Sequence, residues 1–133
     1  MSGKWKSEEV TKVMKAYVEG GHATKAIEKC DATYQFNITD KKDGEPVYQF
    51  WVRLKKDPKT GIGKADKPDA TFTLTDNDFW DMCMGKLNPQ MAFVKKQMKI
   101  GGNFKKASIF TPDLFPKPTP ENIEKFTKGQ PKL

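Results

Sequence analysis

The chain has 133 residues, of which 36% are hydrophobic and 31% are charged. This length fits one domain, and this balance is typical of a globular protein and excludes a disordered chain. No stretch reaches the roughly 18 apolar residues that a transmembrane helix needs. No apolar segment of the kind found in a secretory leader follows Met1. We therefore expect one domain over residues 1–133 that stays inside the cell.

The residue types that most often hold metals or form disulfides are scarce. The chain has a single histidine, His22, and two cysteines, Cys30 and Cys83, far apart in the sequence. A structural zinc site needs four Cys or His ligands at short spacing, so no metal site is expected. A disulfide is not expected either, because isolated cysteines inside cells are more often buried thiols.

Positive charge gathers in one region of the chain. The formal net charge is +7, and residues 86–111 include no acidic residue. The lysines of that region are Lys86, Lys95, Lys96, Lys99, Lys105 and Lys106. Such a surface favours acidic lipid headgroups, phosphorylated ligands or nucleic acid, although lysines that only solvate one face remain an equal alternative.

The first expected helix runs from Ser7, its expected N-cap, to the Gly20-Gly21 pair. Its apolar residues recur at the i, i+3, i+4 spacing of one helical face: Val10, Val13, Met14, Tyr17 and Val18. A second, shorter helix is expected over His22–Cys30.

Four segments then alternate between apolar and polar side chains. Their apolar members are Tyr34, Phe36 and Ile38; Tyr48, Phe50, Val52 and Leu54; Phe72 and Leu74; and Met98 and Ile100. Period-two alternation means that each strand buries one face only, so we expect one sheet with a solvated face and helices on the other. Lys41–Gly44 predicts a hairpin turn, and Asp57–Lys64 predicts a further turn or a short strand.

Two more helices are expected after the third of these strands. Thr75, followed three residues later by Asp78, matches a capping box at the start of a helix that ends at Gly85. Asn88-Pro89 begins the next helix, with proline at its first position. In the tail over residues 112–133, closely spaced prolines exclude a long helix, and Thr119–Phe126 predicts a short one.

Neither catalysis nor nucleic-acid binding has a strong signal. His22 and the cluster of Asp76, Asp78 and Asp81 are the candidate catalytic or cation-binding groups, but acids are also favoured at a helix N-terminus. We expect no enzyme and no cofactor. The expected solvated sheet face offers Trp51 as its one aromatic residue, so a nucleic-acid-binding module is the alternative interpretation, not the expected one.

Methionine and phenylalanine are concentrated between residues 79 and 115. Methionine recurs at adaptable binding surfaces, so this region is either a plain hydrophobic core or a binding site. The residues concerned are Phe79, Trp80, Met82, Met84, Met91, Phe93, Met98, Phe104, Ile109, Phe110 and Phe115.

Three segments resemble the sterol carrier protein type 2 family, the non-specific lipid-transfer domain. They are Pro68–Phe79 (PDATFTLTDNDF), Gly85–Phe93 (GKLNPQMAF) and Lys99–Asn103 (KIGGN). The order of the expected elements also agrees, and the resemblance covers roughly residues 8–111. It implies an α+β fold with a single five-stranded sheet, helices packed on one face, and an apolar ligand tunnel between sheet and helices.

The resemblance also implies a function without covalent chemistry. The protein would be an intracellular, monomeric carrier that binds fatty acids, fatty acyl-CoA, sterols or phospholipids and transfers them between membranes or enzymes. By position, the ligand-binding residues implied are Phe50, Phe72, Phe79, Met82, Met84, Gln90, Met91, Phe93, Met98, Ile100, Phe104, Ile109, Phe110 and Phe115.

Further expectations concern the charged surface and the tail. An anionic headgroup or a transiently bound membrane surface would contact Lys95, Lys96, Lys99, Lys105 and Lys106. The tail is expected to close the tunnel mouth with Phe110, Leu114, Phe115, Ile123 and Phe126.

The last three residues differ from a peroxisomal signal only in their first position, where Pro131 precedes Lys132 and Leu133. The expected location is therefore the peroxisome, with an import receptor as a partner, and otherwise the cytoplasm.

Overall fold

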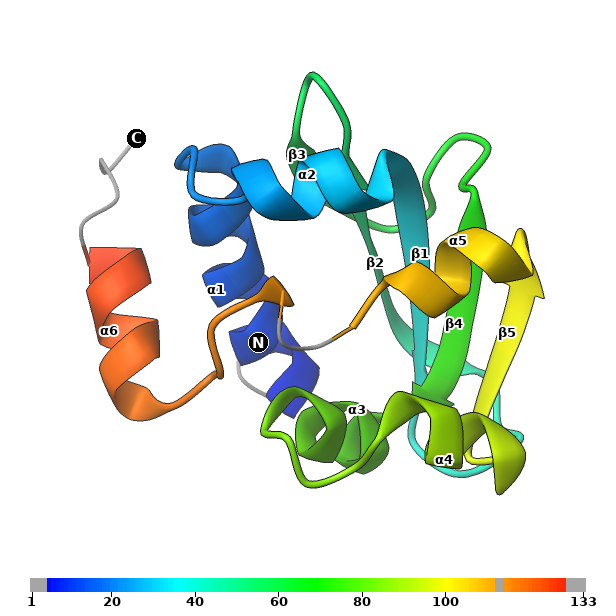
Figure 1. The fold of residues 1–133 in the computed structure, drawn as a ribbon. Helices are drawn as coiled ribbons and strands as arrows, with labels where there is room; N and C mark the ends of the chain where they lie inside the picture. The colour runs from blue at the N-terminus through cyan, green and yellow to red at the C-terminus, as the bar shows by residue number, and fades with distance from the viewer. Residues whose placement is uncertain (1–4, 112–113, 129–133) are drawn as a thin grey trace.

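The computed structural model describes residues 5–111 and 114–128. It contains one five-stranded sheet in the order β3-β2-β1-β4-β5, with the helices packed on one face (Figure 1). The strands are β1 (Ala32–Thr39), β2 (Pro46–Leu54), β3 (Lys59–Ile62), β4 (Ala70–Thr75) and β5 (Met98–Gly102). The helices are α1 (Lys6–Glu19), α2 (Thr24–Cys30), α3 (Asp76–Cys83), α4 (Pro89–Val94), α5 (Phe104–Ile109) and α6 (Pro120–Lys128). The expected fold class is confirmed.

The sheet is mixed, since β1 pairs antiparallel with β2 but parallel with β4. The predicted turn is present at Lys41–Gly44, where the Gly44 amide donates to the Lys41 carbonyl at 2.9 Å. The segment from Asp57 to Lys64 contains the short strand β3, which pairs with β2. The chain must then cross β2 and β1 to reach β4, so the β3–β4 connection passes over the sheet.

The expectation that each strand buries one face only is wrong for β1. Because the connection crosses it, β1 is buried on both faces. Gln35 points to the face opposite the helices, yet it is only 4% exposed. Its amide donates to the Gly63 carbonyl at 3.0 Å and accepts from the Ala65 amide at 2.7 Å, both in the β3–β4 connection. The outer face of the central strand is therefore covered by this connection, with its polar side chain fully paired.

Helix α1 buries the apolar stripe that the sequence predicted, but its start differs. Ser7 is not the N-cap: the helix begins at Lys6, and Ser7 lies in its first turn. The Asp76 carboxylate, at the start of α3, accepts from the amides of Lys6 at 3.0 Å and Ser7 at 2.8 Å. A carboxylate from a distant part of the chain thus satisfies amides that a local cap would otherwise take.

Helix α5 was not predicted from the sequence. Asn103 caps it by accepting a hydrogen bond from the Lys106 amide at 3.0 Å. The Tyr34 hydroxyl of β1 donates to the Lys106 carbonyl at 2.8 Å, and the Lys106 ammonium donates to the Cys30 carbonyl at 2.9 Å. These bonds fix α5 above the β1–β4 side of the sheet and at the end of α2.

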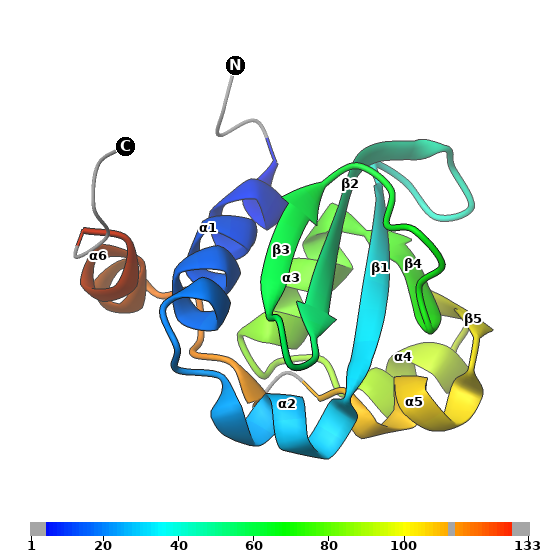
Figure 2. The ribbon, with the colours of Figure 1, turned by 90° about the horizontal axis from the view of Figure 1, so that it is seen from above.

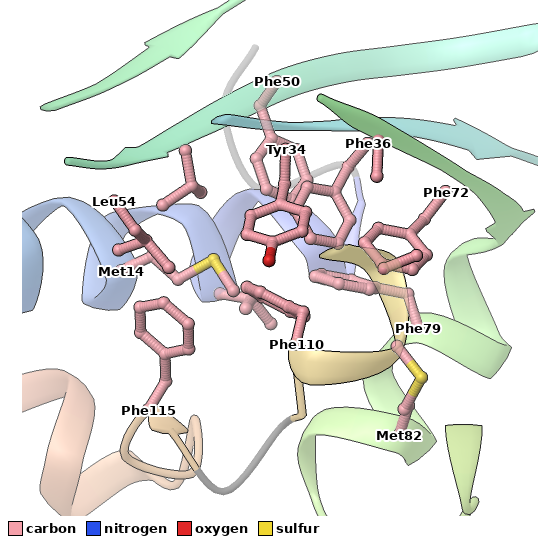
Figure 3. Close-up of a cluster of buried hydrophobic side chains, with 14 of the residues drawn as sticks. Met14, Tyr34, Phe36, Phe50, Leu54, Phe72, Phe79, Met82, Phe110 and Phe115 are labelled. Carbon is pink, nitrogen blue, oxygen red and sulfur yellow. The ribbon is translucent and has the colours of Figure 1, made fainter. Parts of the chain in front are cut away.

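Aromatic rings form the centre of the core between the sheet and the helices (Figure 3). Phe36 stacks on Phe50 with ring centroids 4.8 Å apart, and Phe110 lies 4.6 Å from Tyr34 and 5.6 Å from Phe115. Figure 3 shows Phe110 in the middle of the labelled rings, facing the sheet. Its side chain, directly after α5, therefore fills part of the space between the sheet and the helices.

The tail runs away from β5. Phe115 contacts Tyr17 of α1, with ring centroids 5.9 Å apart, and α6 then packs against α1 (Figure 2). None of the helices within the described ranges is both long enough and apolar enough to cross a membrane.

Candidate functional site

A cleft of about 520 Å³ lies between α4, α5 and the β4–β5 edge of the sheet. Figure 1 shows α4 and α5 on either side of this edge. The lining residues are Phe72, Asn88, Pro89, Gln90, Phe93, Val94, Met98, Ile100, Phe104, Ala107, Ser108, Phe110 and Thr111. Known small-molecule sites span roughly 300–1,000 Å³, so the cleft is large enough for a ligand.

The floor of the cleft is set by the pairing of β4 with β5. Phe72 on β4 pairs with Ile100 on β5. Met98 lies two residues before Ile100, on the same face of β5. Gly102 ends β5 with a φ of 78°, and a Cβ there would lie 2.6 Å from the Asp69 carbonyl oxygen. Only glycine fits this turn, which carries the chain from β5 directly into α5.

The two short helices form the walls. Residues of α4 at the i, i+3, i+4 spacing, Gln90, Phe93 and Val94, face the cleft. Across the opening, the Phe93 and Phe104 rings lie 5.4 Å apart. Phe93 is 42%, Phe104 55% and Val94 70% exposed, so the cleft is open to solvent. Large apolar side chains exposed together are typical of a ligand site or an interaction surface.

The polar groups of the cleft are few. The Asn88 carboxamide accepts from the Gln90 and Met91 amides as the cap of α4, and the Ser108 hydroxyl donates to the Lys105 carbonyl at 2.8 Å. Both are therefore engaged in their own helices, while the Gln90 and Thr111 side chains also line the cleft. The cleft as a whole offers an apolar surface with little to select among polar functional groups.

The structure brings together half of the ligand-binding residues that the resemblance implied. Those lining the cleft are Phe72, Gln90, Phe93, Met98, Ile100, Phe104 and Phe110. The structure also adds lining residues that sequence reasoning missed: Asn88, Pro89, Val94, Ala107, Ser108 and Thr111. On α5, Phe104, Ala107 and Ser108 share one helical face, a spacing that could be recognised only if the helix itself had been predicted.

The other implied residues lie elsewhere. Phe79, Met82 and Phe115 border a nearly filled space of about 10 Å³ beneath α1, which Val10, Val13 and Met14 also line. Phe50 is stacked in the core, and Met84 and Ile109 are half-buried outside both spaces. Met91 is exposed on α4.

Phe110 borders both the cleft and this inner space. The structure thus contains an open cleft and a nearly filled inner space on the two sides of one ring, and a continuous tunnel stays a prediction. Helix α6 packs on α1, away from the cleft, so the described part of the tail does not cover the opening. The side chain of Phe126 and the residues Pro131, Lys132 and Leu133 lie outside the described part of the chain.

The five lysines expected at the opening have different surroundings. Lys99 pairs with Asp43 at 2.8 Å, and this hydrogen bond holds the pKa of the Asp43 carboxyl below its ordinary value. Lys106 is bound to the end of α2, as described above. Lys95 and Lys105 are exposed, and Lys96 lines a groove that adjoins the cleft.

Two of the residues considered for catalysis, Asp76 and His22, have structural partners. Asp76 holds the first turn of α1, and His22 stacks on Tyr17 with ring centroids 5.7 Å apart. Both cysteines are free thiols, and burial raises the pKa of Cys83 to about 12, so this thiol is neutral at physiological pH. Within residues 5–111 and 114–128, no three His, Cys, Asp or Glu side chains are grouped as metal ligands.

Comparison with known proteins agrees with this architecture. Residues 12–112 match the SCP-2 sterol transfer family. Sterol carrier protein 2 of Arabidopsis thaliana is 42% identical over 86% of this chain and 94% of that protein. Peroxisomal multifunctional enzyme A of Dictyostelium discoideum is 36% identical over 63% of this chain, which spans only 19% of that enzyme.

Two solved structures illustrate the likeness in fold. Sterol carrier protein 2 from Yarrowia lipolytica, in its apo form, has a TM-score of 0.71 at 21% identity, with 97% of this chain and 98% of that chain covered. Palmitated SCP2L2 from Aedes aegypti has a TM-score of 0.59 at 25% identity, with 76% and 86% covered. With most of its length matched in sequence and the same fold, the chain belongs to the SCP-2 sterol transfer family.

Proposed function

We propose that this protein is a lipid carrier that holds an acyl chain or a comparable apolar ligand in the cleft between α4, α5 and β5. The observation that carries the proposal is the cleft itself, about 520 Å³ lined by apolar side chains and open to solvent. The relative from Aedes aegypti is described as palmitated, which supports an acyl chain as the ligand.

Burial of apolar surface is enough to account for such binding. Each CH₂ group removed from water contributes about 0.8 kcal/mol, so a chain of twelve carbons offers on the order of 9 kcal/mol. A site of this kind discriminates mainly by length and bulk, since most of its lining is apolar. Fatty acids, acyl-CoA, sterols and phospholipids are therefore all candidate ligands.

Transfer would use contact between the cleft opening and a membrane. Val94 and Phe104 are exposed apolar side chains that line this opening, and the exposed Lys95 and Lys105 lie next to them in the chain. Apolar side chains can enter the headgroup region while the lysines bind anionic lipids, at about 1 kcal/mol per lysine. A bound ligand would then leave directly into the bilayer.

Filling the cleft tests the proposal. Ser108 is exposed and lines the cleft, so Ser108→Trp places a large ring in the space that the chain would occupy. We expect delipidated wild-type protein to bind a fluorescent fatty acid saturably and Ser108→Trp to lose at least tenfold in affinity. Lys105→Trp is the matched control, because Lys105 is exposed on the same helix but does not line the cleft.

Equal affinities of wild type and Ser108→Trp would contradict the cleft as the binding site. A wild-type protein that binds no fatty acid, acyl-CoA or sterol would contradict the carrier function itself. A displacement series with these three ligands would rank them.

We include a peroxisomal location in the proposal, supported by the relative named as a peroxisomal enzyme. Imaging of the whole chain with a fluorescent protein at its N-terminus tests it. Co-localisation with a peroxisomal marker is expected, and a purely diffuse signal would contradict it.

A further inference from the structure

The two edges of the sheet differ in their surroundings. β3 forms one edge, where α1 packs along it and the Glu19 carboxylate accepts a hydrogen bond from the Thr60 amide at 3.1 Å. β5 forms the other edge, and within the described ranges it pairs only with β4. Figures 1 and 2 show β5 at the outer end of the sheet, on the side away from α1 and α6. One edge is therefore covered by a helix, whereas the other is open to a further strand.

The register of β5 determines which of its backbone groups face outward. The Asn103 amide donates to the Asp69 carbonyl at 2.7 Å, and this pair continues the register of β4 and β5. Hydrogen-bonded and non-bonded pairs alternate in an antiparallel ladder, so the peptide groups of Lys99 face β4. Those of Met98 and Ile100 then point away from the sheet, to where an added strand would lie.

The space beside this edge differs between the two faces of the sheet. A groove of about 590 Å³ runs along β5, and its apolar lining is shared with the cleft on the helix-covered face: Phe93, Val94, Met98 and Ile100. Its charged lining consists of Lys42, Asp43, Lys96 and Lys99. Successive side chains of a strand point to opposite faces, so Lys99 lies on the outer face, where it pairs with Asp43 at 2.8 Å. The edge is therefore apolar on one face and basic on the other.

The charge of the groove indicates what can pair with this edge. Three of its charged residues are lysines and one is an aspartate. The described residues give Lys99 an ion-pair partner but give none to Lys42 or Lys96. A second copy of the chain would bring two such basic groups together, and like charges across a strand pair are destabilising. An acidic segment is attracted instead.

We propose that β5 is a docking edge for an extended segment of a partner protein, in which acidic and apolar side chains alternate. The segment adds a strand beside β5. Its acidic side chains face Lys42 and Lys99, and its apolar side chains face Phe93 and Val94. Backbone hydrogen bonds supply affinity in this mode of recognition, and the alternating side chains supply specificity.

Docking at this edge places the partner beside the opening of the cleft, because the groove and the cleft share one side. The inference goes beyond lipid binding and does not depend on it. It can therefore be tested on protein from which lipid has been removed.

The test titrates the ¹⁵N-labelled full chain with a blocked peptide of about seven residues, in which glutamate alternates with valine, long enough to span β5. Amide hydrogen exchange is followed by nuclear magnetic resonance. We expect saturable binding that slows exchange of the Met98 and Ile100 amides by about tenfold or more. The Lys99 amide, which already faces β4, should change little.

Two control peptides separate strand addition from attraction by charge. One has the same composition with its valines grouped together, and the other has lysine in place of glutamate. Both should bind more weakly than the alternating acidic peptide.

A double variant tests the basic face of the groove. Lys42→Glu with Lys96→Glu should weaken binding of the acidic peptide by about tenfold, since each reversal removes one exposed charge pair and adds a repulsion. Lys25→Glu with Lys29→Glu on α2 is the matched control, because both lysines are exposed and lie outside the groove. This control should bind the peptide like wild type.

Binding that leaves exchange at Met98 and Ile100 unchanged would overturn the added strand, and so would equal binding of the grouped peptide. If vesicles containing phosphatidylserine slow these two amides and the peptide does not, the edge contacts a membrane and the proposal is wrong. Failure of the peptide leaves the carrier function standing. Likewise, a protein that binds the peptide but no lipid would contradict the carrier function alone.

Discussion

Phe110 is the residue on which the size of the binding site depends. Its ring is 6% exposed, contacts Tyr34, Phe36, Phe72 and Phe115, and forms a wall of both the cleft and the inner space beneath α1. In the proposed carrier, a ligand that outgrew the cleft would meet the Phe110 ring first, so we expect Phe110 to limit the chain length that binds well.

Replacing Phe110 with alanine should join the two spaces. We expect Phe110→Ala to lower the free energy of unfolding by about 3–5 kcal/mol and to extend the range of chains over which affinity rises with length. Urea unfolding measures the first effect. Affinities for a fatty-acid series of roughly ten to twenty carbons measure the second. Phe110→Leu, at about 1–2 kcal/mol, is the milder companion if the alanine variant does not fold. Identical length profiles for wild type and a folded variant would show that Phe110 sets no limit.

Among the elements, the start of helix α1 is held by a residue from outside the helix. Asp76 at the start of α3 accepts hydrogen bonds from the first amides of α1, in addition to the apolar stripe that α1 buries. These bonds join the N-termini of two helices, which both favour a carboxylate. The Asp76 carboxylate therefore adds a polar contact to the apolar packing of α1 against α3.

We expect Asp76→Ala to lower the free energy of unfolding by about 1–3 kcal/mol, because it leaves the amides of Lys6 and Ser7 unpaired. Asp78→Ala is the control, since Asp78 lies in the same turn and only its backbone amide is used, by Thr75. Its loss should stay below about 1 kcal/mol. Equal losses in urea unfolding would assign the effect to helix-terminal charge alone.

Elements with strong periodicity could be predicted, and those defined by distant partners could not. The stripe of α1 and the alternation in β2 and β4 follow from local spacing, as does the cap at Thr75. Helix α5 has only six residues and is positioned by Tyr34, so local spacing does not define it. The burial of Gln35 likewise depends on a connection that arrives from β3.

The site was predictable to the same degree and for the same reason. Phe93 and Met98 were identified by position, but Ser108 and Val94 line the cleft only because α4 and α5 stand on opposite sides of it. Phe79 and Met82 belong to the same apolar region of the sequence, yet α3 directs them beneath α1. Composition does not distinguish the residues that line the cleft from those packed in the neighbouring core.

In the molecule as a whole, the cleft opening and the tail lie at opposite ends. The α6 end packs on α1, while α4, α5 and β5 form the other end (Figures 1 and 2). Exposed apolar and basic side chains therefore surround an opening that the described part of the tail leaves free, an arrangement suited to contact with a membrane.

Electrostatic attraction to that membrane predicts a dependence on salt. We expect the rate of fatty-acid transfer to anionic vesicles to fall as salt shortens the screening length from about 30 Å at 0.01 M to about 8 Å at 0.15 M. Transfer to uncharged vesicles should change little. The double variant Lys95→Glu with Lys105→Glu should lose most of this dependence, whereas Lys25→Glu on α2, an exposed lysine of another element, should retain it. A rate to anionic vesicles that is independent of salt would contradict the electrostatic contribution.

The position of a bound chain tests the central claim most directly. Delipidated protein with labelled methyl groups is mixed with one equivalent of ¹³C-labelled palmitate, and nuclear Overhauser contacts between ligand and protein are recorded. The cleft predicts contacts from the chain to the methyl groups of Val94, Met98 and Ile100. Contacts confined to Val10, Val13 and Met14 would instead place the ligand in the inner space beneath α1 and contradict the account.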